Sequence, residues 1–360
     1  MAVKKLRAGI IGCGGIAHGK HMPGLKMTKH VDMVAFCDII ESRATKAASE
    51  YGTDDAKAYK DYKKLLKNEK LDMVYVLTPN KSHAAITITA LEAGNHVMCE
   101  KPMAKTAKDA RAMVDAAKRT GKLLTIGYQS RHMADARYIK AAVERGDLGD
   151  IYFAKAHALR RRAVPTWGVF LNEEEQGGGP LIDIGTHALD LTLWLMNNYK
   201  PKSVMGNVYK KLNHNGVCGN AFGNWNPDEF TVEDSAFGFI TMEDGATISL
   251  ETSWALNIVD FAEAKTTLCG TKAGADMKSG VRINGDDLGL LYEKTPDLTK
   301  GSVAYFEGES NDPLVIEQMV FINAIRKGTP LVVLPEQACV VTEILEAIYK
   351  SAKTGKLVTF

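Results

Sequence analysis

The stretch 6-LRAGIIGCGGIA-17 decides the fold of this chain. An apolar run, Leu6–Ile11, enters a glycine cluster, and Gly12 to Ala17 match the pattern G-x-G-x-x-A. A helical stretch follows, and an acidic residue, Asp38, lies 21 positions after Ala17 at the end of the next apolar run. A strand, a glycine turn, a helix and a later acidic residue form the dinucleotide-binding arrangement. The stretch therefore predicts the opening unit of a doubly wound α/β domain.

The residues of the glycine loop have distinct expected tasks in holding a dinucleotide. Gly12 permits the tight turn, Gly14 lets the backbone approach the pyrophosphate, and Ala17 allows close packing of helix and strand. Backbone N–H groups at the start of the helix receive the pyrophosphate, so Gly15 and Ile16 belong to the same expected contact.

Asp38 favours NAD over NADP as the cofactor. Its carboxylate is expected to accept hydrogen bonds from the adenosine ribose, and a 2′-phosphate at that place would face a negative charge. The next three residues, 39–41, offer no compensating cation. Arg43 would weaken the preference if it faced the ribose, but we expect it on the following helix.

The first ~130 residues continue the alternation of strand and helix. Helix-like segments at Ser82–Ala93 and Thr106–Arg119 each end at a glycine, which is a helix stop signal. Short apolar runs suit strands that are buried on both faces; they are Met33–Cys37, Met73–Leu77, His96–Cys99 and Leu123–Ile126. This rhythm predicts a parallel sheet with right-handed crossovers.

After Gly127 the pattern changes to alternating strands and a few helices. Glu243-Asp244-Gly245 predicts a hairpin turn between two of these strands. Strands are expected at 150–160, 203–210, 235–242 and 247–254, and helices at 134–145, 312–327 and 335–353. We therefore predict an N-terminal Rossmann domain (1–127) and an α+β domain (128–360). The second domain would carry a large, open-faced, mostly antiparallel sheet, and its C-terminal helices are candidates to pack back on the first.

The composition is that of a globular protein with no charge excess. The 360 residues include 45 Lys and Arg against 43 Asp and Glu, a net charge of +2. At roughly 150 residues per domain this length predicts two domains. The balanced charge argues against nucleic acid as a partner, and no apolar run reaches the ~18 residues of a membrane span.

The N-terminal segment and the cysteines favour a cytoplasmic location. Residues 10–13 mimic a lipoprotein cleavage site, but only five residues separate Arg7 from Cys13 and two of them are glycine. A secretory core needs ~7–15 apolar residues. The six cysteines are scattered without a Cys-x-x-Cys pair, which is typical of reduced thiols.

Two further predicted strands end in residues suited to chemistry. The third is followed by Thr78, Asn80 and His83, and the fourth by Glu100-Lys101-Pro102. Open α/β sheets bind ligands at the carboxyl ends of their strands. A lysine there can stand beside the nicotinamide and polarise a substrate oxygen. Most lysines are surface residues, but the flanking Glu and Pro favour a fixed geometry for Lys101.

These motifs, together with Asp183-Ile184-Gly185-Thr186-His187, resemble the Gfo/Idh/MocA oxidoreductases along essentially the whole chain. This family includes glucose-fructose oxidoreductase and inositol 2-dehydrogenase. The resemblance implies NAD as cofactor and a catalytic group of Lys101, Asp183 and His187. It also implies homo-oligomers formed through the outer face of the second-domain sheet. The implied cofactor contacts beyond the glycine loop and Asp38 are Arg43, Thr78, Asn80, His83, Glu100, Lys101 and Gln129.

The residue chemistry agrees with those catalytic roles. His187 lies near the start of an apolar helix, 187–196, and Asp183 lies four residues before it, so both can share one helix face. His187 would take the hydroxyl proton as a general base. Lys101 would stabilise the developing alkoxide, and Asp183 would orient the substrate or the imidazole. The alternative makes Asp183 a helix cap and His187 a core residue.

Three residues are weaker candidates for substrate contacts, and none suggests a metal site. Arg131 follows the fifth strand, while Arg162 and Trp167 lie where a polyol could bind. The alternatives are a strand end that meets solvent for Arg162 and a core position for Trp167. His18 and His21 share a helix face, but no carboxylate or thiol partner is evident beyond Cys13. We therefore expect both histidines on the helix surface and not in a zinc site.

The resemblance implies a secondary alcohol of a sugar, glycoside or cyclitol as the substrate. The segment Arg160–Trp167 followed by Gly177-Gly178-Gly179 resembles members that oxidise C3 of glucose or glucosides to a 3-keto sugar. Three alternatives remain open: an inositol dehydrogenase, an NAD-dependent glycosidase that oxidises C3 transiently, and a noncatalytic NAD or sugar sensor.

Overall fold

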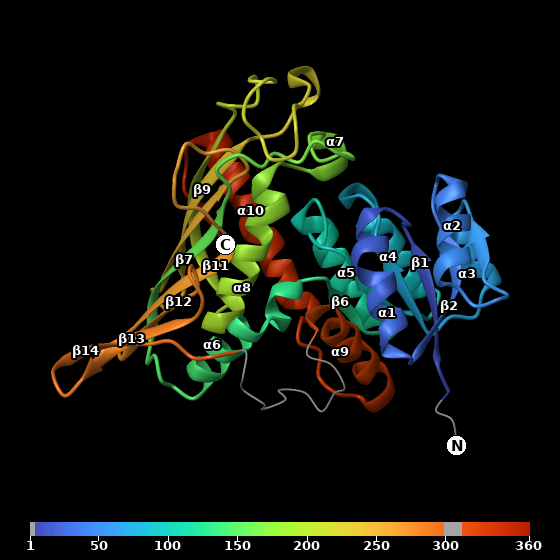
Figure 1. Ribbon diagram of the computed structural model, residues 1–360, viewed down its shortest axis with the longest axis horizontal. Coiled ribbons are helices and arrows are strands. Elements are labelled where there is room, and N and C mark those ends of the chain that lie inside the picture. Colours follow the sequence, from blue (N-terminus) through green and yellow to red (C-terminus); the bar gives the residue numbers. More distant parts are fainter. Residues whose placement is uncertain (1–3, 299–311) are drawn as a thin grey trace. The chain divides into compact units, whose positions relative to one another are not determined.

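The computed structural model describes residues 4–298 and 312–360, and its contacts divide the chain into two units. Unit 1 comprises Met1–Gln129 and Val303–Cys339, and unit 2 comprises Ser130–Ser302 and Val340–Phe360 (Figure 1). The predicted domain boundary after Gly127 thus lies two residues before the end of the first segment of unit 1.

Unit 1 is built on a six-stranded parallel sheet in the order β3-β2-β1-β4-β5-β6. Winding reverses between β1 and β4, and such a switch point is where doubly wound sheets bind ligands. The predicted parallel sheet is confirmed, although the edge strand β3 was not predicted. The strands are β1 (Leu6–Ile11), β2 (Val31–Cys37), β3 (Lys57–Tyr59), β4 (Met73–Val76), β5 (His96–Cys99) and β6 (Leu124–Ile126).

Helices cover this sheet. A π-helical turn, Ala17–His21, runs directly into α1, which packs against α2 and α9. Helix α4 packs against α5. The helices are α1 (Met22–Thr28), α2 (Glu41–Tyr51), α3 (Tyr62–Asn68), α4 (His83–Glu92), α5 (Ala107–Thr120) and α9 (Pro313–Lys327).

Helix α9 belongs to unit 1 although it follows the strands of unit 2 in the sequence. The hydroxyl of Tyr75, on β4, donates a 2.6 Å hydrogen bond to Oε1 of Gln318 on α9. Both side chains are fully buried. This contact joins segments 243 residues apart and places polar side chains from α9 inside the Rossmann domain.

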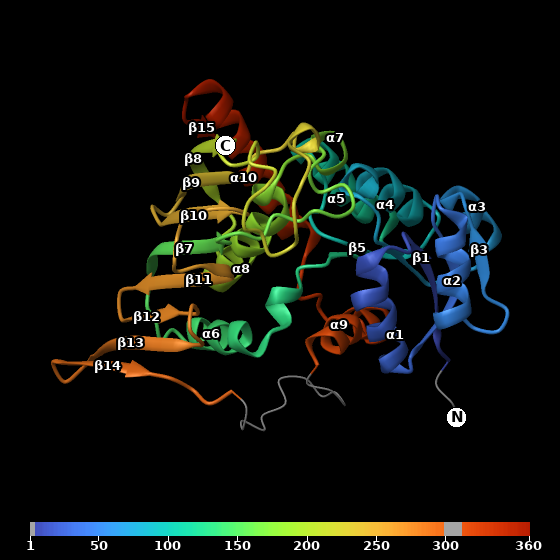
Figure 2. The same cartoon turned by 45° about the horizontal axis from the view of Figure 1, so that its top comes forward.

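Unit 2 carries a nine-stranded sheet in the order β14-β13-β12-β11-β7-β10-β9-β8-β15, which Figure 2 shows from β15 to β14. Neighbouring strands are antiparallel except β7 and β10, so the predicted mostly antiparallel sheet is confirmed. The strands are β7 (Ile151–Leu159), β8 (Pro201–Tyr209), β9 (Ser235–Met242), β10 (Thr247–Ser253), β11 (Ala262–Gly270), β12 (Ala273–Asp276), β13 (Arg282–Asp287), β14 (Leu290–Lys294) and β15 (Val358–Thr359).

One face of this sheet is covered by helices. Helix α8 (Thr186–Met196) packs against β7 and β11. From α10 (Pro335–Thr354), Ser351 accepts a hydrogen bond from the N–H of Gly206 on β8. Unit 2 also contains α6 (Ala134–Glu144) and the short α7 (Glu173–Gln176). Alternate residues of β8, β9 and β10 are buried, as expected for a sheet with one open face.

Within residues 4–298 and 312–360, every helix is too short or too polar to cross a bilayer.

Candidate active site

The glycine loop in unit 1 brings the ends of β1 and β4 into close contact. Gly12 has φ of +95°, a conformation that L side chains rarely adopt. A Cβ atom at this position would lie 2.5 Å from the carbonyl oxygen of Leu77. Glycine is therefore required at position 12 for two independent reasons, as the motif predicted.

The outer side of the loop fits a dinucleotide. A Cβ atom at Gly14 or Gly15 would meet no atom within 4 Å, so the backbone there is open to a ligand. The helical segment that begins at Ala17 follows immediately, and the first N–H groups of a helix can bind an anion. The predicted pyrophosphate contacts of Gly14, Gly15 and Ile16 stay a prediction.

Asp38 is held at the end of β2 by the glycine loop itself. One carboxylate oxygen accepts the N–H of Cys13 at 2.9 Å, and the other accepts the N–H of Ile40 at 2.9 Å. A carboxylate oxygen can accept more than one hydrogen bond, so both retain capacity for ribose hydroxyls. Arg43 lies exposed in the first turn of α2, as expected.

His83 joins the loops that follow β4 and β5, and its predicted cofactor contact stays a prediction. The ring is fully buried, with Nδ1 2.8 Å from the carbonyl oxygen of Pro102 and Nε2 2.8 Å from that of Thr78. Both ring nitrogens are therefore engaged by backbone. Thr78 is half-buried and Asn80 is buried, and their predicted cofactor contacts stay predictions.

Glu100 fixes the backbone of Lys101, and its predicted cofactor contact stays a prediction. Its Oε2 accepts the N–H of Lys101 at 2.9 Å, while Oε1 lies 3.0 Å from Nζ of Lys20 and 2.7 Å from Nε2 of His21. Burial alone would raise the pKa of Glu100, but Lys20 and His21 hold that pKa well below its usual range. The Lys101 side chain itself is half-buried.

The charge network behind Glu100 continues into α9 and was missed from the sequence. Lys20 is buried and also pairs with Glu317 on α9 at 3.0 Å. Burial would lower the pKa of Lys20, but Glu100 and Glu317 raise it above its ordinary value. The sequence contains one indication of this network, because Glu317 and Gln318 interrupt an otherwise apolar run.

In unit 2, Asp183 and His187 lie on one continuous helical segment. A π-helical turn, Leu181–Gly185, leads into α8, and both side chains are half-buried. The indole N–H of Trp254 donates a 3.0 Å hydrogen bond to Oδ2 of Asp183. Trp254 is fully buried, so its indole ring holds the carboxylate of Asp183 in place. The sequence had assigned Trp254 no role.

A buried carboxylate shapes the triple-glycine turn before Asp183. Glu233 accepts the N–H groups of Gly179 at 2.9 Å and of Leu181 at 3.1 Å, and the hydroxyl of Tyr349 at 2.8 Å. A Cβ atom at Gly179 would lie 2.2 Å from the carbonyl oxygen of Glu233. The turn that leads into the helix of His187 is therefore fixed by contacts that only glycine allows.

Arg131 forms an ion pair with Asp190 inside unit 2, and its predicted substrate contact stays a prediction. It is fully buried and forms a bidentate pair with Asp190 of α8, at 2.9 and 2.6 Å. Gln129 is exposed at the start of a 3-10 turn, and its predicted cofactor contact stays a prediction.

The other two weak candidates differ in exposure. Arg162 is half-buried and donates a 2.6 Å hydrogen bond to Asn257. Trp167 is 52% exposed, so it is not a core residue.

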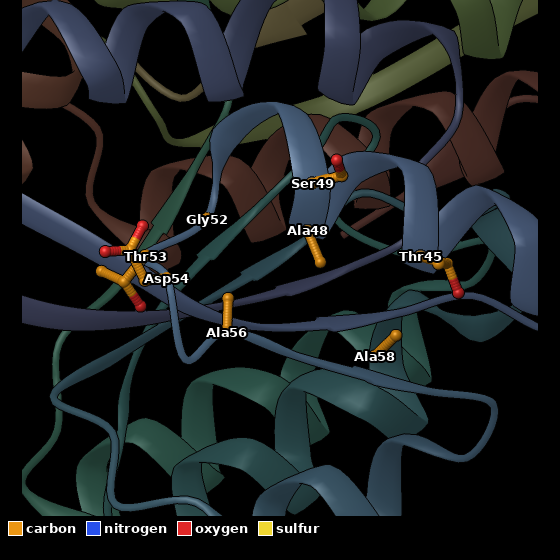
Figure 3. A pocket seen from close by; sticks show the side chains of 8 residues that line it. All are labelled: Thr45, Ala48, Ser49, Gly52, Thr53, Asp54, Ala56 and Ala58. Atoms are coloured by element: carbon orange, nitrogen blue, oxygen red, sulfur yellow. The ribbon is translucent and has the colours of Figure 1, made fainter.

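A separate hollow in unit 1 lies along α2 and β3 (Figure 3). Its volume is about 350 Å³, and Asp54 is the one charged residue among the eight that line it. None of the predicted site residues contributes to it. The hollow is lined by Thr45, Ala48, Ser49, Gly52, Thr53, Asp54, Ala56 and Ala58.

Comparisons with known proteins match both parts of the chain. Residues 6–128 match the model of an oxidoreductase family with an NAD-binding Rossmann fold, and residues 136–276 match the GFO/IDH/MocA C-terminal domain. D-glucoside 3-dehydrogenase of Escherichia coli is 37% identical over 359 residues, covering 99% of this chain and 97% of that protein.

More distant relatives include other sugar and cyclitol enzymes. Inositol 2-dehydrogenase of Salmonella typhimurium is 31% identical over 202 residues, which cover 55% of this chain and 57% of that protein. The solved structure of levoglucosan dehydrogenase with NADH and levoglucosan has a TM-score of 0.82 at 20% identity, covering 99% of both chains. At that identity the likeness concerns the fold.

Proposed function

Because this chain belongs to the Gfo/Idh/MocA oxidoreductase family, we propose that it oxidises the C3 hydroxyl of a glucoside to a 3-keto glucoside. The chain is an NAD-dependent oxidoreductase of sugar hydroxyls. The choice of glucoside and of C3 is supported by 37% identity to a D-glucoside 3-dehydrogenase along 99% of the chain. Inositol is the second candidate, and its relative matches only 55% of the chain.

The residues of unit 1 suit cofactor binding and charge stabilisation. Gly14, Gly15, Ile16 and Asp38 would hold NAD, which supplies the acceptor for the hydride that leaves the carbinol carbon. Lys101 would stabilise negative charge on the substrate oxygen as its proton leaves. The hydrogen bond from its N–H to Glu100 fixes the backbone from which the ammonium group extends.

The residues of unit 2 suit proton removal. His187 would accept the proton of the C3 hydroxyl as general base. Asp183 would orient the substrate or the imidazole, and Trp254 limits the directions in which its carboxylate can point. The fixed turn before Asp183 and the rigid helix α8 reduce the motion that must be frozen before reaction.

Product analysis tests this proposal directly. Purified protein with NAD is incubated with glucose, methyl glucoside, phenyl glucoside and myo-inositol, and products are identified by mass spectrometry and NMR. We expect a glucoside product that lacks two hydrogens and carries a ketone at C3. Oxidation of myo-inositol alone would favour the second candidate. Release of sugar without ketone would identify a glycosidase, and binding without any product would identify a sensor.

We also propose that the open face of the unit 2 sheet binds a second copy of this chain. Apolar side chains gather there on neighbouring strands, with Met205 45% and Phe239 51% exposed and Tyr209 in edge-to-face contact with Phe237. Antiparallel pairing puts Met205 directly opposite Phe239, so these residues share one face. Sedimentation should show a multimer that Phe239→Glu dissociates; a wild-type monomer of 39.2 kDa would contradict the proposal.

A cytoplasmic location is part of the same proposal. All six cysteines lie in the described ranges and none forms a disulfide, which is typical of a reducing compartment. Cell fractionation tests it.

A further inference from the structure

Two aromatic side chains of unit 2 form an exposed pair. The rings of Trp167 and Phe222 lie 4.8 Å apart in an edge-to-face arrangement, and the side chains are 52% and 44% exposed. Trp167 follows β7, and Phe222 lies in the long loop before β9. Aromatic rings of this size usually bury most of their surface, so a pair facing solvent is a candidate ligand contact.

Hydrogen bonds between the two loops hold the pair in this position. The hydroxyl of Thr166 donates to the carbonyl oxygen of Phe222 at 2.6 Å. The side chain of Asn220 accepts the N–H of Val164 at 2.8 Å and donates to its carbonyl oxygen at 3.0 Å. These hydrogen bonds join residues beside Trp167 to residues beside Phe222. The exposed faces of the two rings are therefore held in position before a ligand binds.

A line of aromatic rings connects the pair with Asp183. Trp167 contacts Phe170 at 5.8 Å between ring centroids, and Phe170 contacts Trp254 at 6.5 Å. Trp254 in turn donates its hydrogen bond to Asp183. One aromatic ring, that of Phe170, therefore separates Trp167 from Trp254, the residue that fixes the proposed catalytic carboxylate.

We propose that Trp167 and Phe222 bind the apolar face of a second ring, carried on the anomeric oxygen of the glucoside. The inference rests on the proposed glucoside oxidation, which places the reacting sugar at Asp183. With Phe170 between them, the pair would meet the substituent of that sugar rather than the sugar itself. Aromatic aglycones and pyranose rings share the required chemistry, a flat face that packs against an aromatic side chain.

The test compares Trp167→Ala with Tyr152→Ala, which removes another exposed aromatic side chain of unit 2, 58% exposed on β7. Kinetics are measured with phenyl glucoside, cellobiose, methyl glucoside and glucose. We expect Trp167→Ala to lower kcat/KM about tenfold for the substrates that carry a second ring, through KM. Methyl glucoside and glucose should be unaffected, and Tyr152→Ala should change nothing. Loss with phenyl glucoside alone would identify an aromatic aglycone, and loss with cellobiose a second sugar.

Other outcomes would overturn the subsite. An equal loss of kcat/KM with all four substrates would make Trp167 a structural residue. An unchanged kcat/KM with every substrate would exclude a contact between Trp167 and the second ring. A changed sedimentation coefficient would assign the pair to an interface. Phe222→Ala repeats each measurement in case Trp167→Ala is unstable.

Quenching of tryptophan fluorescence by phenyl glucoside separates this inference from the proposed function. Binding that requires Trp167 without any oxidation would reject the function and keep the subsite. Oxidation at C3 that ignores Trp167→Ala would keep the function and reject the subsite.

Discussion

Replacing Lys101 with alanine is expected to lower kcat by about 10²–10³-fold, the usual cost of losing one group that stabilises a developing oxyanion. The loss should fall on kcat and kcat/KM alike, because the ammonium group would act on charge that appears only as the hydroxyl proton leaves. We expect NAD binding to weaken far less than kcat falls. Steady-state kinetics with the preferred glucoside and calorimetric titration with NAD measure the two effects separately.

Lys108→Ala is the matched control for this prediction. Lys108 is an exposed lysine of α5, seven positions further along in the same unit. Its removal changes the net charge equally but removes no proposed oxyanion contact. If Lys101→Ala retained the kcat of Lys108→Ala, the proposed role of Lys101 would be wrong. If NAD binding were lost along with kcat, Lys101 would belong to the cofactor site instead.

The parallel sheet of unit 1 could be predicted because its strands are buried on both faces. Such strands are continuous apolar runs, as in Met73–Val76, and they remain visible without any knowledge of their neighbours. The edge strand Lys57–Tyr59 has no buried residue and therefore no such run. In unit 2, β14 is exposed along its whole length, and its sequence lacks the alternation of apolar and polar residues that indicates a half-buried strand.

The motif residues of the site could also be predicted, but their supporting contacts could not. Gly12 and Asp38 are revealed by spacing along a short stretch. Trp254 reaches Asp183 across 71 residues, and Glu317 reaches Lys20 across 297. Single-sequence patterns carry no information about such pairs. For the same reason the sequence did not reveal the partner of Arg131, because Asp190 lies 59 residues away.

That buried pair gives the largest expected effect on stability. Asp190→Asn keeps the size of the side chain but leaves the guanidinium of Arg131 without its bidentate counter-charge. Both side chains are fully buried, so water cannot replace the lost partner. Removing one member of a buried ion pair typically costs about 3–5 kcal/mol, and we expect the free energy of unfolding to fall by this amount. Urea denaturation followed by circular dichroism measures the loss.

We expect the unpaired charge of Arg131, rather than a change of packing around α8, to cause the loss of stability in Asp190→Asn. Asp190→Leu combined with Arg131→Met removes both charges and should recover much of the stability, because apolar pairs of similar volume replace buried ion pairs at little cost. The control is Asp147→Asn, which breaks the exposed pair with Arg145 and should change stability little. Equal destabilisation in the double variant would show that packing dominates. Because α8 also carries His187, recovery of the fold without recovery of kcat would show that the pair positions the proposed base.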